Sequence, residues 1–351
     1  MSDDVPSPAL VLDKQLPDAG DGPGGAPLSA AAGGRRSGSL TELASRYGLV
    51  AAFLLTLVVF SVARPSTFPT GRNAESILTS AAPPLILALG LTVVLVMQDF
   101  DLSIGAMIGL GSGAATDFMV TNGVSWFFAV LGVLAIAIAA GLVNGYMVAF
   151  LGGSSFIITL AMGTVLTGVE FAMTSQNTIY SGFSTSFQDI ASKEFLGLSH
   201  QIWIAAVVAV IIWLLLDRSE VGRYMYAIGG NTEAARLSGV RVRVLRMTGF
   251  VIVALSAAIV GLLLTSQSGS YAPNIGTSYL LPAFAAVFLG AAVFRPGEFN
   301  VAGTIVGVIF LGVIQTGLTM LDLATYMINL VQGGILVTAV LVSRLGQRRA
   351  G

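Results

Sequence analysis

One polar stretch, YAIGGNTEAARLSGVRVRV, interrupts a chain that otherwise consists mainly of apolar runs, and it covers residues 226–244. Its residue types are suited to capping and charging a short helix. Asn231 is a favoured N-cap residue, and Glu233 is favourable near the positive N-terminal end of a helix. Glu233 can pair with Arg236 at i+3, and Gly239 suits the left-handed position that follows a helix. The stretch therefore predicts one short helix with its own caps and its own ion pair.

The predicted helix is too short to be stable by itself. We expect a sharp turn at Gly229 and Gly230 before it, while Ala234, Ala235 and Ser238 continue it to about seven residues, or roughly 10 Å. Isolated helices of this length are marginal in water because nucleation is costly. Something must therefore hold this helix: the membrane surface, the inner ends of other apolar segments, or another protein.

The residues needed for enzyme chemistry are largely missing from the sequence. The chain has no cysteine and one histidine, His200, so it offers no thiolate nucleophile, no disulfide and no cluster of metal ligands. His200 opens an apolar run, where we expect an interfacial residue rather than a general base. The two lysines, Lys14 and Lys193, follow no phosphate-binding GxxxxGK[ST] pattern. The sequence therefore predicts no catalytic residue, no metal site, no cofactor and no nucleotide site of its own.

The composition indicates the solvent in which these elements lie. Of 351 residues, 55% are hydrophobic and only 10% are charged, whereas a soluble domain carries about 25% charged residues. This leaves too little polar surface to cover a globule in water, and the 42 glycines suit closely packed membrane helices. We therefore predict an all-α, polytopic membrane protein. The net charge of −1 gives no indication of nucleic-acid binding.

Ten apolar runs approach the length of about 20 residues that crosses a bilayer. Turn signals such as GR, NG, GGS and PG separate them. The runs are 48–63, 81–97, 102–121, 124–147, 154–175, 200–216, 247–266, 280–294, 301–318 and 325–343. They predict a transmembrane domain of about ten helices over residues 46–345.

The distribution of basic residues predicts the orientation, because cytoplasmic loops are enriched in Lys and Arg. With ten spans and the N-terminus inside, residues 217–246 form the longest inside loop and contain the predicted short helix. Only Arg64, Arg72 and Lys193 then fall in outside loops. The basic residues on the inside are Arg35, Arg36, Arg46, Arg218, Arg223, Arg236, Arg241, Arg243, Arg246, Arg295, Arg344, Arg348 and Arg349. Both termini are therefore predicted to be cytoplasmic.

The two ends of the chain differ from its apolar part. Residues 1–45 hold five of the twelve prolines and are rich in Gly, Ser, Ala and Asp, a composition that cannot bury enough apolar area to fold. We expect a disordered cytoplasmic tail there. It does not read as a secretory signal, because no basic region leads directly into an apolar core. Residues 346–351 form a short basic C-terminal tail.

Four acidic residues lie within or between the apolar runs, where ionisable groups are costly and often functional. Asp99 and Asp101 separate the second run from the third, Asp117 lies late in the third, and Glu170 lies towards the outer end of the fifth. Asp101 could simply cap the third run, and Glu170 could reach the headgroup region. An ion-coupled secondary transporter or a channel for a small polar solute, with Asp101 or Glu170 as the coupled group, therefore stays open.

The polar stretch also resembles a known signature. GRYMYAIGGNTEAARLSGVRV, residues 222–242, is similar to the cytoplasmic signature of the ribose-type sugar permeases, the transmembrane subunits of bacterial ATP-binding-cassette (ABC) importers. DFDLSIG, residues 99–105, is similar to the acidic segment that opens the third span of that family, and residues 281–342 resemble its C-terminal pattern. The resemblance covers residues 48–345, while the loop LGAAVFRPGEFNVAGT, residues 289–304, departs from the family pattern.

The resemblance implies a function and a set of partners. It implies a multi-pass permease of the bacterial inner membrane that imports a simple sugar or related polyol by alternating access, as a homodimer or beside a similar permease. Cytoplasmic ATPase subunits would bind the ATP, and an extracytoplasmic sugar-binding protein would deliver the solute. The short helix would dock on an ATPase subunit. The residues expected to couple to the ATPase are Gly229, Gly230, Asn231, Glu233, Ala234, Ala235, Arg236, Ser238 and Gly239. Branched-chain amino acid permeases are a related alternative, with a different motif in this loop.

Polar side chains within the spans are candidates for lining a sugar route, because sugars are bound by hydrogen bonds from amides, carboxylates and hydroxyls. The same side chain types also bridge helices in membranes. The main candidates are Gln98, Asp101, Ser103, Asn144, Thr167, Glu170 and Gln315, with Thr164, Asn177 and Thr316 beside them. In the third span, Gly105, Gly109 and Gly113 repeat every four residues and predict a ridge for close helix packing.

Overall fold

The computed structural model of the protein describes residues 38–291, 294, 297–335 and 337, with side chains described from residue 50. Residues Met1–Ser39 and Leu40–Gly351 form separate units, and nearly all of the described chain belongs to the second. Most of the predicted N-terminal tail, the end of the tenth apolar run and the tail 346–351 lie outside the described residues. The first helix begins at Gly38, inside the segment predicted to be disordered, because leucine, glutamate and alanine there favour helix.

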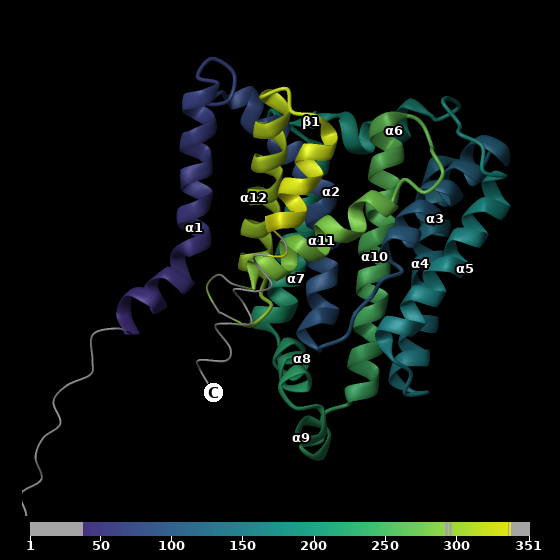
Figure 1. Ribbon diagram of the computed structural model, residues 1–351. Coiled ribbons are helices and arrows are strands. Elements are labelled where there is room, and N and C mark those ends of the chain that lie inside the picture. The colour runs from purple at the N-terminus through teal and green to yellow at the C-terminus, as the bar shows by residue number, and fades with distance from the viewer. Residues whose placement is uncertain (1–37, 292–293, 295–296, 336, 338–351) are drawn as a thin grey trace, which may run out of the picture. The chain divides into compact units, whose positions relative to one another are not determined.

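The described chain is mostly helical (Figure 1). The helices are α1 (Gly38–Ala63), α2 (Gly71–Val96), α3 (Ile104–Thr116), η1 (Asp117–Thr121, a π-helix), α4 (Trp126–Ala149), α5 (Ser155–Thr174), α6 (Thr185–Ser192), α7 (His200–Trp213), η2 (Leu214–Arg218, a π-helix), α8 (Glu220–Gly230), α9 (Thr232–Leu237), α10 (Val242–Ser268), α11 (Thr277–Gly290) and α12 (Val301–Met320). Residues 325–335 are helical as well. A short antiparallel hairpin, β1 (Glu194–Phe195) and β2 (Leu198–Ser199), pairs Glu194 with Ser199.

Seven helices in the described residues are long and apolar enough to cross a membrane. They are Gly71–Val96, Ile104–Thr121, Trp126–Ala149, Ser155–Thr174, His200–Arg218, Val242–Ser268 and Val301–Met320. Two shorter apolar helices, Val50–Ala63 and Thr277–Gly290, accompany them. Each of these helices overlaps one of the predicted runs, and the tenth run is helical as far as residue 335. A polytopic all-α membrane protein is confirmed, and the count of ten stays a prediction.

The helices divide into an inner and an outer group. Most residues of α2, α3 and α10 are buried, whereas α4, α5 and α7 bury few. The outer helices present large apolar side chains such as Leu131, Ile157 and Val207, which are 47%, 66% and 57% exposed. Apolar faces of this extent are not stable in water. We therefore expect lipid or another membrane subunit to cover the outer group.

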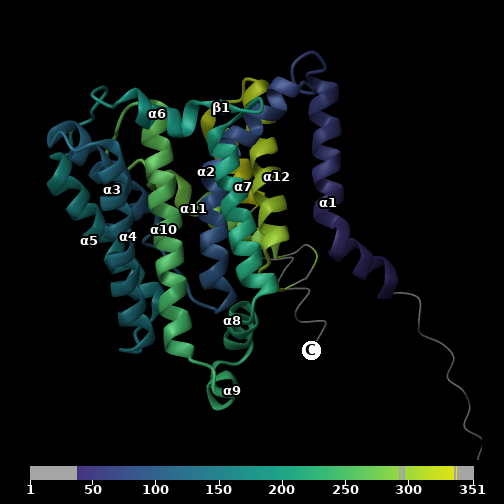
Figure 2. The ribbon, with the colours of Figure 1, turned by 180° about the vertical axis from the view of Figure 1, so that it is seen from behind.

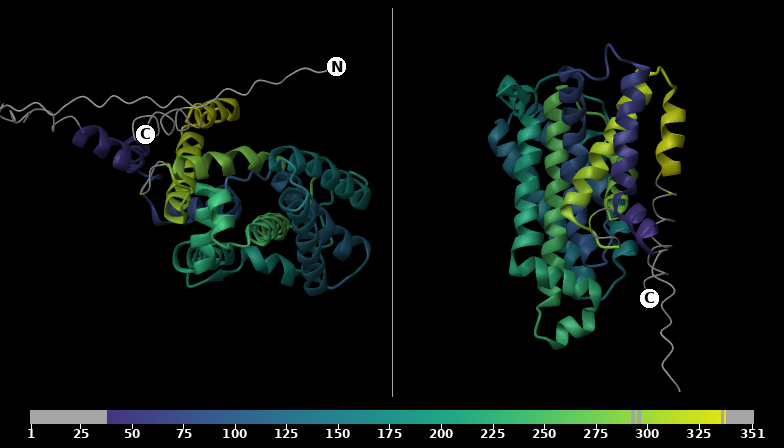
Figure 3. Two further views of the ribbon diagram at one scale, coloured as in Figure 1. Left: turned by 90° about the horizontal axis from the view of Figure 1, so that it is seen from below. Right: turned by 90° about the vertical axis from the view of Figure 1, so that its left-hand side faces the viewer.

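Helix α10 lies at the centre of the inner group. It packs against α2, α3 and α4, and Figure 3 (left) shows it end-on among the other helices. Small residues allow the close approach: a Cβ added at Gly141 of α4 would lie 2.6 Å from the Val251 Cα of α10. A hydrogen bond of 2.5 Å joins Ser112 of α3 to Thr265 of α10. Small side chains and interhelical hydrogen bonds thus hold the centre together, as is typical of membrane helices.

Helix α2 begins at Gly71, ten residues before the predicted start of its run, and it contains Pro83 and Pro84. The prolines do not end the helix. Because Pro83 has no N–H, the carbonyl of Thr79 is left without its partner four residues on. Gln201 Nε2 of α7 donates to that carbonyl at 3.1 Å. A side chain from a neighbouring helix therefore compensates for the missing bond, which sequence patterns cannot reveal.

Two groups of short elements lie at opposite ends of this bundle. Figures 1 and 2 show α8 and α9 at one end, and α6 with the β-hairpin at the other. The side view in Figure 3 (right) also has α9 projecting beyond the long helices. We refer to these as the α9 end and the hairpin end. The predicted polar stretch is therefore the most prominent feature of one end.

Candidate functional site

Helix α9 has the caps that the sequence predicts. Asn231 ends α8 and begins α9, and its Oδ1 accepts a hydrogen bond of 2.9 Å from the Ala234 N–H. Ser238 is the C-cap, and Gly239 has a φ of +86°, the left-handed conformation in which glycine follows a helix. The prediction of a short, doubly capped helix is confirmed.

The predicted ion pair on α9 is also present. Arg236 Nε donates to Glu233 Oε2 at 3.0 Å, and Arg236 Nη2 lies 2.5 Å from Glu233 Oε1. The hydrogen bonds from Arg236 lower the pKa of Glu233 below its usual value. The hydrogen bond to Glu233 raises the pKa of Arg236. Both side chains are exposed, so the pair supports the helix locally and stays accessible to a partner.

One side of α9 is anchored and the rest is exposed. Ala235 is 6% exposed and packs with Val96, Met97 and Ile228 at the end of α2 and α8. Leu237, by contrast, is 75% exposed. Its side chain is therefore accessible to a partner at the projecting tip. Leu237 was not among the residues expected to couple to the ATPase. The sequence alone does not show which side of so short a helix a given residue occupies.

The expected turn at Gly229 and Gly230 is wrong. Both residues belong to the last turn of α8, and the chain changes direction at Asn231, whose backbone is extended (φ −158°, ψ 101°). A Cβ on Gly229 would overlap the carbonyl oxygen of Val96 at the end of α2. Gly230 has no atom within 4 Å of such a Cβ. Gly229 therefore provides a close helix contact rather than flexibility.

Residues 97–103, which join α2 to α3, are held by several side-chain hydrogen bonds. Asp99 is 2% exposed and forms a salt bridge with Arg246 of α10, with Arg246 Nε 2.7 Å from Asp99 Oδ2. Gln98, in the same connection, is exposed and has a φ of +64°. The pairing of Asp99 with Arg246 was not predicted, since the two residues are 147 positions apart.

Three of the predicted path residues form one buried cluster. Asp101 Oδ1 accepts hydrogen bonds from the Ser103 N–H at 2.8 Å and from the Ser103 hydroxyl at 2.5 Å. Asn144 Nδ2 of α4 donates to Ser103 Oγ at 3.0 Å. Asp101 Oδ2 and Asn144 Oδ1 are buried without a partner. Because Ser103 is itself the N-cap of α3, Asp101 binds the capping residue and does not cap the helix directly.

Glu170 of α5 belongs to a second buried cluster, which includes Tyr271 and Thr174. It is fully buried, and its Oε1 accepts hydrogen bonds from Tyr271 Oη at 2.9 Å and from the Asn274 N–H at 3.1 Å. Thr174 Oγ1 lies 3.0 Å from the same tyrosine oxygen. The expectation that Glu170 reaches the headgroups is wrong, because its carboxylate turns inward against the glycines of α3.

The remaining predicted path residues are scattered. Thr167 is half-buried on α5, and Gln315 is exposed on α12, 3.4 Å from Gln332. Thr164 and Asn177 are exposed, and Thr316 is half-buried. The structure thus brings together Asp101, Ser103 and Asn144, places Glu170 elsewhere, and does not unite the rest into one site.

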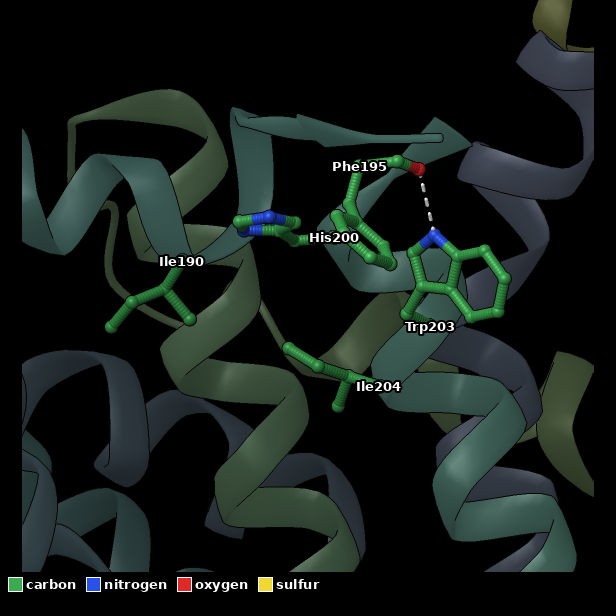
Figure 4. A pocket seen from close by; sticks show the side chains of 5 residues that line it. All are labelled: Ile190, Phe195, His200, Trp203 and Ile204. Atoms are coloured by element: carbon green, nitrogen blue, oxygen red, sulfur yellow. Dashed lines mark hydrogen bonds between the residues drawn. The ribbon is translucent and has the colours of Figure 1, made fainter. Parts of the chain in front are cut away.

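The single histidine lies at the hairpin end (Figure 4). His200 is the first residue of α7, and its Nδ1 is 3.0 Å from the carbonyl oxygen of Asp189. It lines a pocket of about 370 Å³ with four apolar or aromatic residues, Ile190, Phe195, Trp203 and Ile204. Trp203 Nε1 donates to the carbonyl of Phe195 at 3.0 Å. Aromatic residues that flank the end of an apolar helix are typical of the membrane interface.

Within the described residues, no group of three or more His, Asp or Glu side chains is arranged to hold a metal ion. The buried acidic residues are bound within the protein: Asp99 to an arginine, Asp101 to a serine, and Glu170 to a tyrosine and a backbone amide. These arrangements hold segments of the chain together and bring no nucleophile to a base.

Comparison with known proteins identifies the family. A family model described as "Branched-chain amino acid transport system / permease component" matches residues 73–340. The ribose import permease protein RbsC of Escherichia coli (strain K12) is 32% identical over 317 residues, which are 90% of this chain and 98% of that protein. The L-arabinose ABC transporter permease protein AraH of Azospirillum brasilense is 32% identical over 326 residues, which are 92% and 95% of the two chains.

A third relative is the galactose/methyl galactoside import permease protein MglC of Salmonella typhimurium (strain LT2), 32% identical over 319 residues, which are 86% of this chain and 95% of that protein. These similarities extend over almost the whole of each relative. The match to the family model includes the connection 97–103 and the whole of α8, α9 and α10. The chain therefore belongs to the family of ABC-importer permeases that includes these ribose, arabinose and galactose proteins, and it is a multi-pass protein of the inner membrane.

Proposed function

We propose that this chain is the transmembrane permease subunit of an ABC importer for a simple sugar or a related polyol. The names of its relatives, which are import permeases for ribose, arabinose and galactose, support a sugar as the solute. The relatives are equally similar to this chain although their sugars differ, so they favour no single sugar. The chain supplies a route and a mechanical connection, while the ATP is bound by a separate subunit.

We further propose that the chain crosses the membrane ten times, with both termini in the cytoplasm. The seven long apolar helices, the two shorter ones and the helix that starts at residue 325 supply enough elements for this topology. The concentration of arginines in the α8–α10 region supports a cytoplasmic position for the α9 end. The hairpin end then faces the outside, where an extracytoplasmic sugar-binding protein would dock.

The observation that carries the proposal is the exposed tip of α9. Ala235 fixes the helix to the ends of α2 and α8, while Glu233, Arg236 and Leu237 are exposed. A subunit without a nucleotide site needs a firmly attached, protruding element through which a motor can move it. We assign the docking of the ATPase subunit to this tip, together with the capping residues Asn231, Ser238 and Gly239 that hold its shape.

For the route we propose a dimer of this chain, or of this chain and a similar permease, that alternates between outward-open and inward-open states. The side chains proposed to line the route are Gln98, Asp101, Ser103, Asn144, Thr167, Glu170 and Gln315. The buried oxygens of Asp101, Asn144 and Glu170 that have no partner support Asp101, Ser103, Asn144 and Glu170 as the members most suited to meet a hydroxylated solute, because unpaired buried acceptors are costly unless a donor reaches them.

The test is co-purification of a tagged chain with its ATPase subunit in mild detergent, with the subunit identified by mass spectrometry through its GxxxxGK[ST] sequence. We expect the parent to retain the ATPase. Leu237→Glu and Arg236→Glu should lower its recovery by about tenfold or more, since central contacts dominate binding energy. Arg223→Glu is the matched control, because Arg223 pairs with Glu220 on the neighbouring α8 and is equally exposed.

Two outcomes would contradict the proposal. Equal recovery of the ATPase with the parent, Leu237→Glu and Arg236→Glu would show that α9 is not the docking element. If no ATPase accompanied the parent chain, the loop would be a surface connector. The ion-coupled carrier, with Asp101 or Glu170 as the coupled group, would then be the function to pursue.

A further inference from the structure

The connection 97–103 is unusual because it is not helical and, apart from Gln98, is not exposed, although it lies between two membrane helices. Its backbone is bonded by side chains of another helix: Phe100 N–H donates to Ser155 Oγ at 3.1 Å, and Leu102 N–H donates to Thr159 Oγ1 at 2.9 Å, both on α5. Irregular backbone at membrane depth is tolerated only where protein surrounds it. The connection therefore takes its position from the helices that hold it.

The strongest of these attachments is the ion pair between Asp99 and Arg246. Arg246 Nε is 2.7 Å from Asp99 Oδ2, and Arg246 Nη2 is 2.5 Å from Asp99 Oδ1, which is the two-pronged geometry of the strongest charge-assisted bonds. The carboxylate side chain is 2% exposed and the arginine side chain 25%. Separating opposite charges in such a poorly solvated place is costly, so the pair stays closed when one side moves.

On one side, the pair is connected to α9 through the first turns of α10. Arg246 lies in the second turn of α10, and α10 follows α9 after a short bend. The bend is closed by hydrogen bonds from the Gly239 N–H to the Arg236 carbonyl at 3.1 Å and from the Val240 N–H to the Ala235 carbonyl at 3.1 Å. A displacement of α9 therefore reaches the start of α10 without a flexible linker between them.

On the other side, the pair is joined to the buried polar cluster. Asp99 is two residues before Asp101, whose carboxylate holds Ser103, and Ser103 accepts from Asn144 of α4. Phe100, between them, stacks on Phe284 of α11 with ring centroids 6.4 Å apart. A movement of Asp99 is therefore transferred to residues on three helices, because coupling follows contiguous packed and bonded side chains.

We infer that the Asp99–Arg246 ion pair is the link through which a displacement of α9 and the start of α10 reaches residues 97–103 and the Asp101–Ser103–Asn144 cluster. This inference rests on the proposed function, in which an ATPase moves α9. We assign Asp99 and Arg246 a positioning role: they determine how far a displacement of α9 is transmitted to the Asp101–Ser103–Asn144 cluster.

The test exploits the absence of cysteine from the chain. Gln98→Cys places one thiol at an exposed position next to Asp99, and its rate of modification by a soluble maleimide reports the state of the connection. The complex with the ATPase subunit is labelled without nucleotide and with ATP plus vanadate. The variant of interest is Asp99→Asn/Arg246→Gln, which removes both charges at once and so leaves no unpaired buried charge. The matched control is Arg243→Gln, one turn earlier on α10, where the arginine lies over the Phe150 ring.

In the parent and in the Arg243→Gln control, we expect the labelling rate to change by about tenfold between the two conditions, as when a minor state becomes the dominant one. In the double variant the ATPase should still co-purify, while the change falls to within about twofold. In the single variants Asp99→Asn and Arg246→Gln, the change in labelling rate should fall as far as in the double variant, because either substitution breaks the ion pair.

Three results would overturn the inference. The first is a double variant that binds the ATPase and keeps the parental change in labelling, which would leave the proposed function intact. The second is a double variant that fails to insert while Arg243→Gln inserts, which would make the pair a folding element. The third is a parent chain that binds no ATPase, which would remove the proposed function and this inference together.

Discussion

The carboxylate of Glu170 on α5 rests against Gly109 on α3, at a point where a Cβ on residue 109 would overlap Glu170 Oε2. One turn later, a Cβ on Gly113 would lie 3.2 Å from the Glu170 Cγ. The spacing of glycines in the third span predicted a packing ridge without saying what packs on it. The ridge accommodates a buried acidic side chain, which in turn holds Tyr271 and the backbone of Asn274.

Gly109→Ala should therefore destabilise the protein. The added methyl group must displace the Glu170 carboxylate, and overpacking of this kind costs about 1–3 kcal/mol. The check is the apparent melting temperature in detergent, with Gly168→Ala as the control on α5, where a Cβ meets nothing within 4 Å. The control should be neutral or slightly stabilising, since alanine favours helix over glycine. Equal melting temperatures for both variants would contradict the packing assigned to Gly109.

Glu170→Gln and Glu170→Ala should differ in their effect. Glutamine keeps an oxygen that can accept from Tyr271 and Asn274, whereas alanine removes the acceptor used by the fully buried Tyr271 hydroxyl, at a cost of about 1–3 kcal/mol. We expect Glu170→Ala to lower the melting temperature, and Glu170→Gln to have a melting temperature close to that of the parent. ATP-dependent uptake should survive in Glu170→Gln. Loss of uptake in a stable Glu170→Gln protein would instead favour an ion-coupled carrier.

Thr159→Val should disturb the connection between α2 and α3. Valine has nearly the same shape as threonine but cannot accept the hydrogen bond from the Leu102 N–H. Loss of this partly buried hydrogen bond costs about 0.5–1.5 kcal/mol, so we expect a lower melting temperature and faster proteolysis near residue 102. Thr164→Val, on the exposed face of the same helix, is the control and should behave like the parent. A stable Thr159→Val protein would show that another group can satisfy this amide.

Gly229 and Gly230 are adjacent and should respond in opposite ways to alanine. Gly229→Ala pushes α8 away from the end of α2, because its Cβ overlaps the Val96 carbonyl, whereas Gly230→Ala meets open space. We expect Gly229→Ala to lower the melting temperature and the recovery of the ATPase, with a cost of about 1–3 kcal/mol for the overpacking. Gly230→Ala should leave both measurements unchanged. If both variants behaved alike, α8 would not depend on the Gly229 contact.

Features that depend on neighbours in the chain were predictable. The caps of α9 and the Glu233–Arg236 pair follow from residue types three positions apart, so the letters alone indicate them. The membrane helices follow from the length and composition of the apolar runs, because a bilayer requires about 20 apolar residues whatever their order. The start of α2 was missed, because Pro83 and Pro84 resemble a helix start when the partner that compensates for them, Gln201, is distant in sequence.

Contacts between distant segments were decided by the tertiary structure. Asp99 and Arg246 are each recognisable as charged residues near a membrane helix, but only the packing of α10 beside α2 and α3 makes them partners. Glu170 turns inward because Gly109 and Gly113 of α3 leave room for it, and Leu237 is exposed because Ala235 occupies the anchored side of α9. Local periodicity and composition therefore indicate which segments are helical, since those energies are local, whereas the boundary of α2 depended on a distant partner. The direction in which a buried charge points depends on the free space and the partners that other helices provide, and the chain acquires these only when it folds.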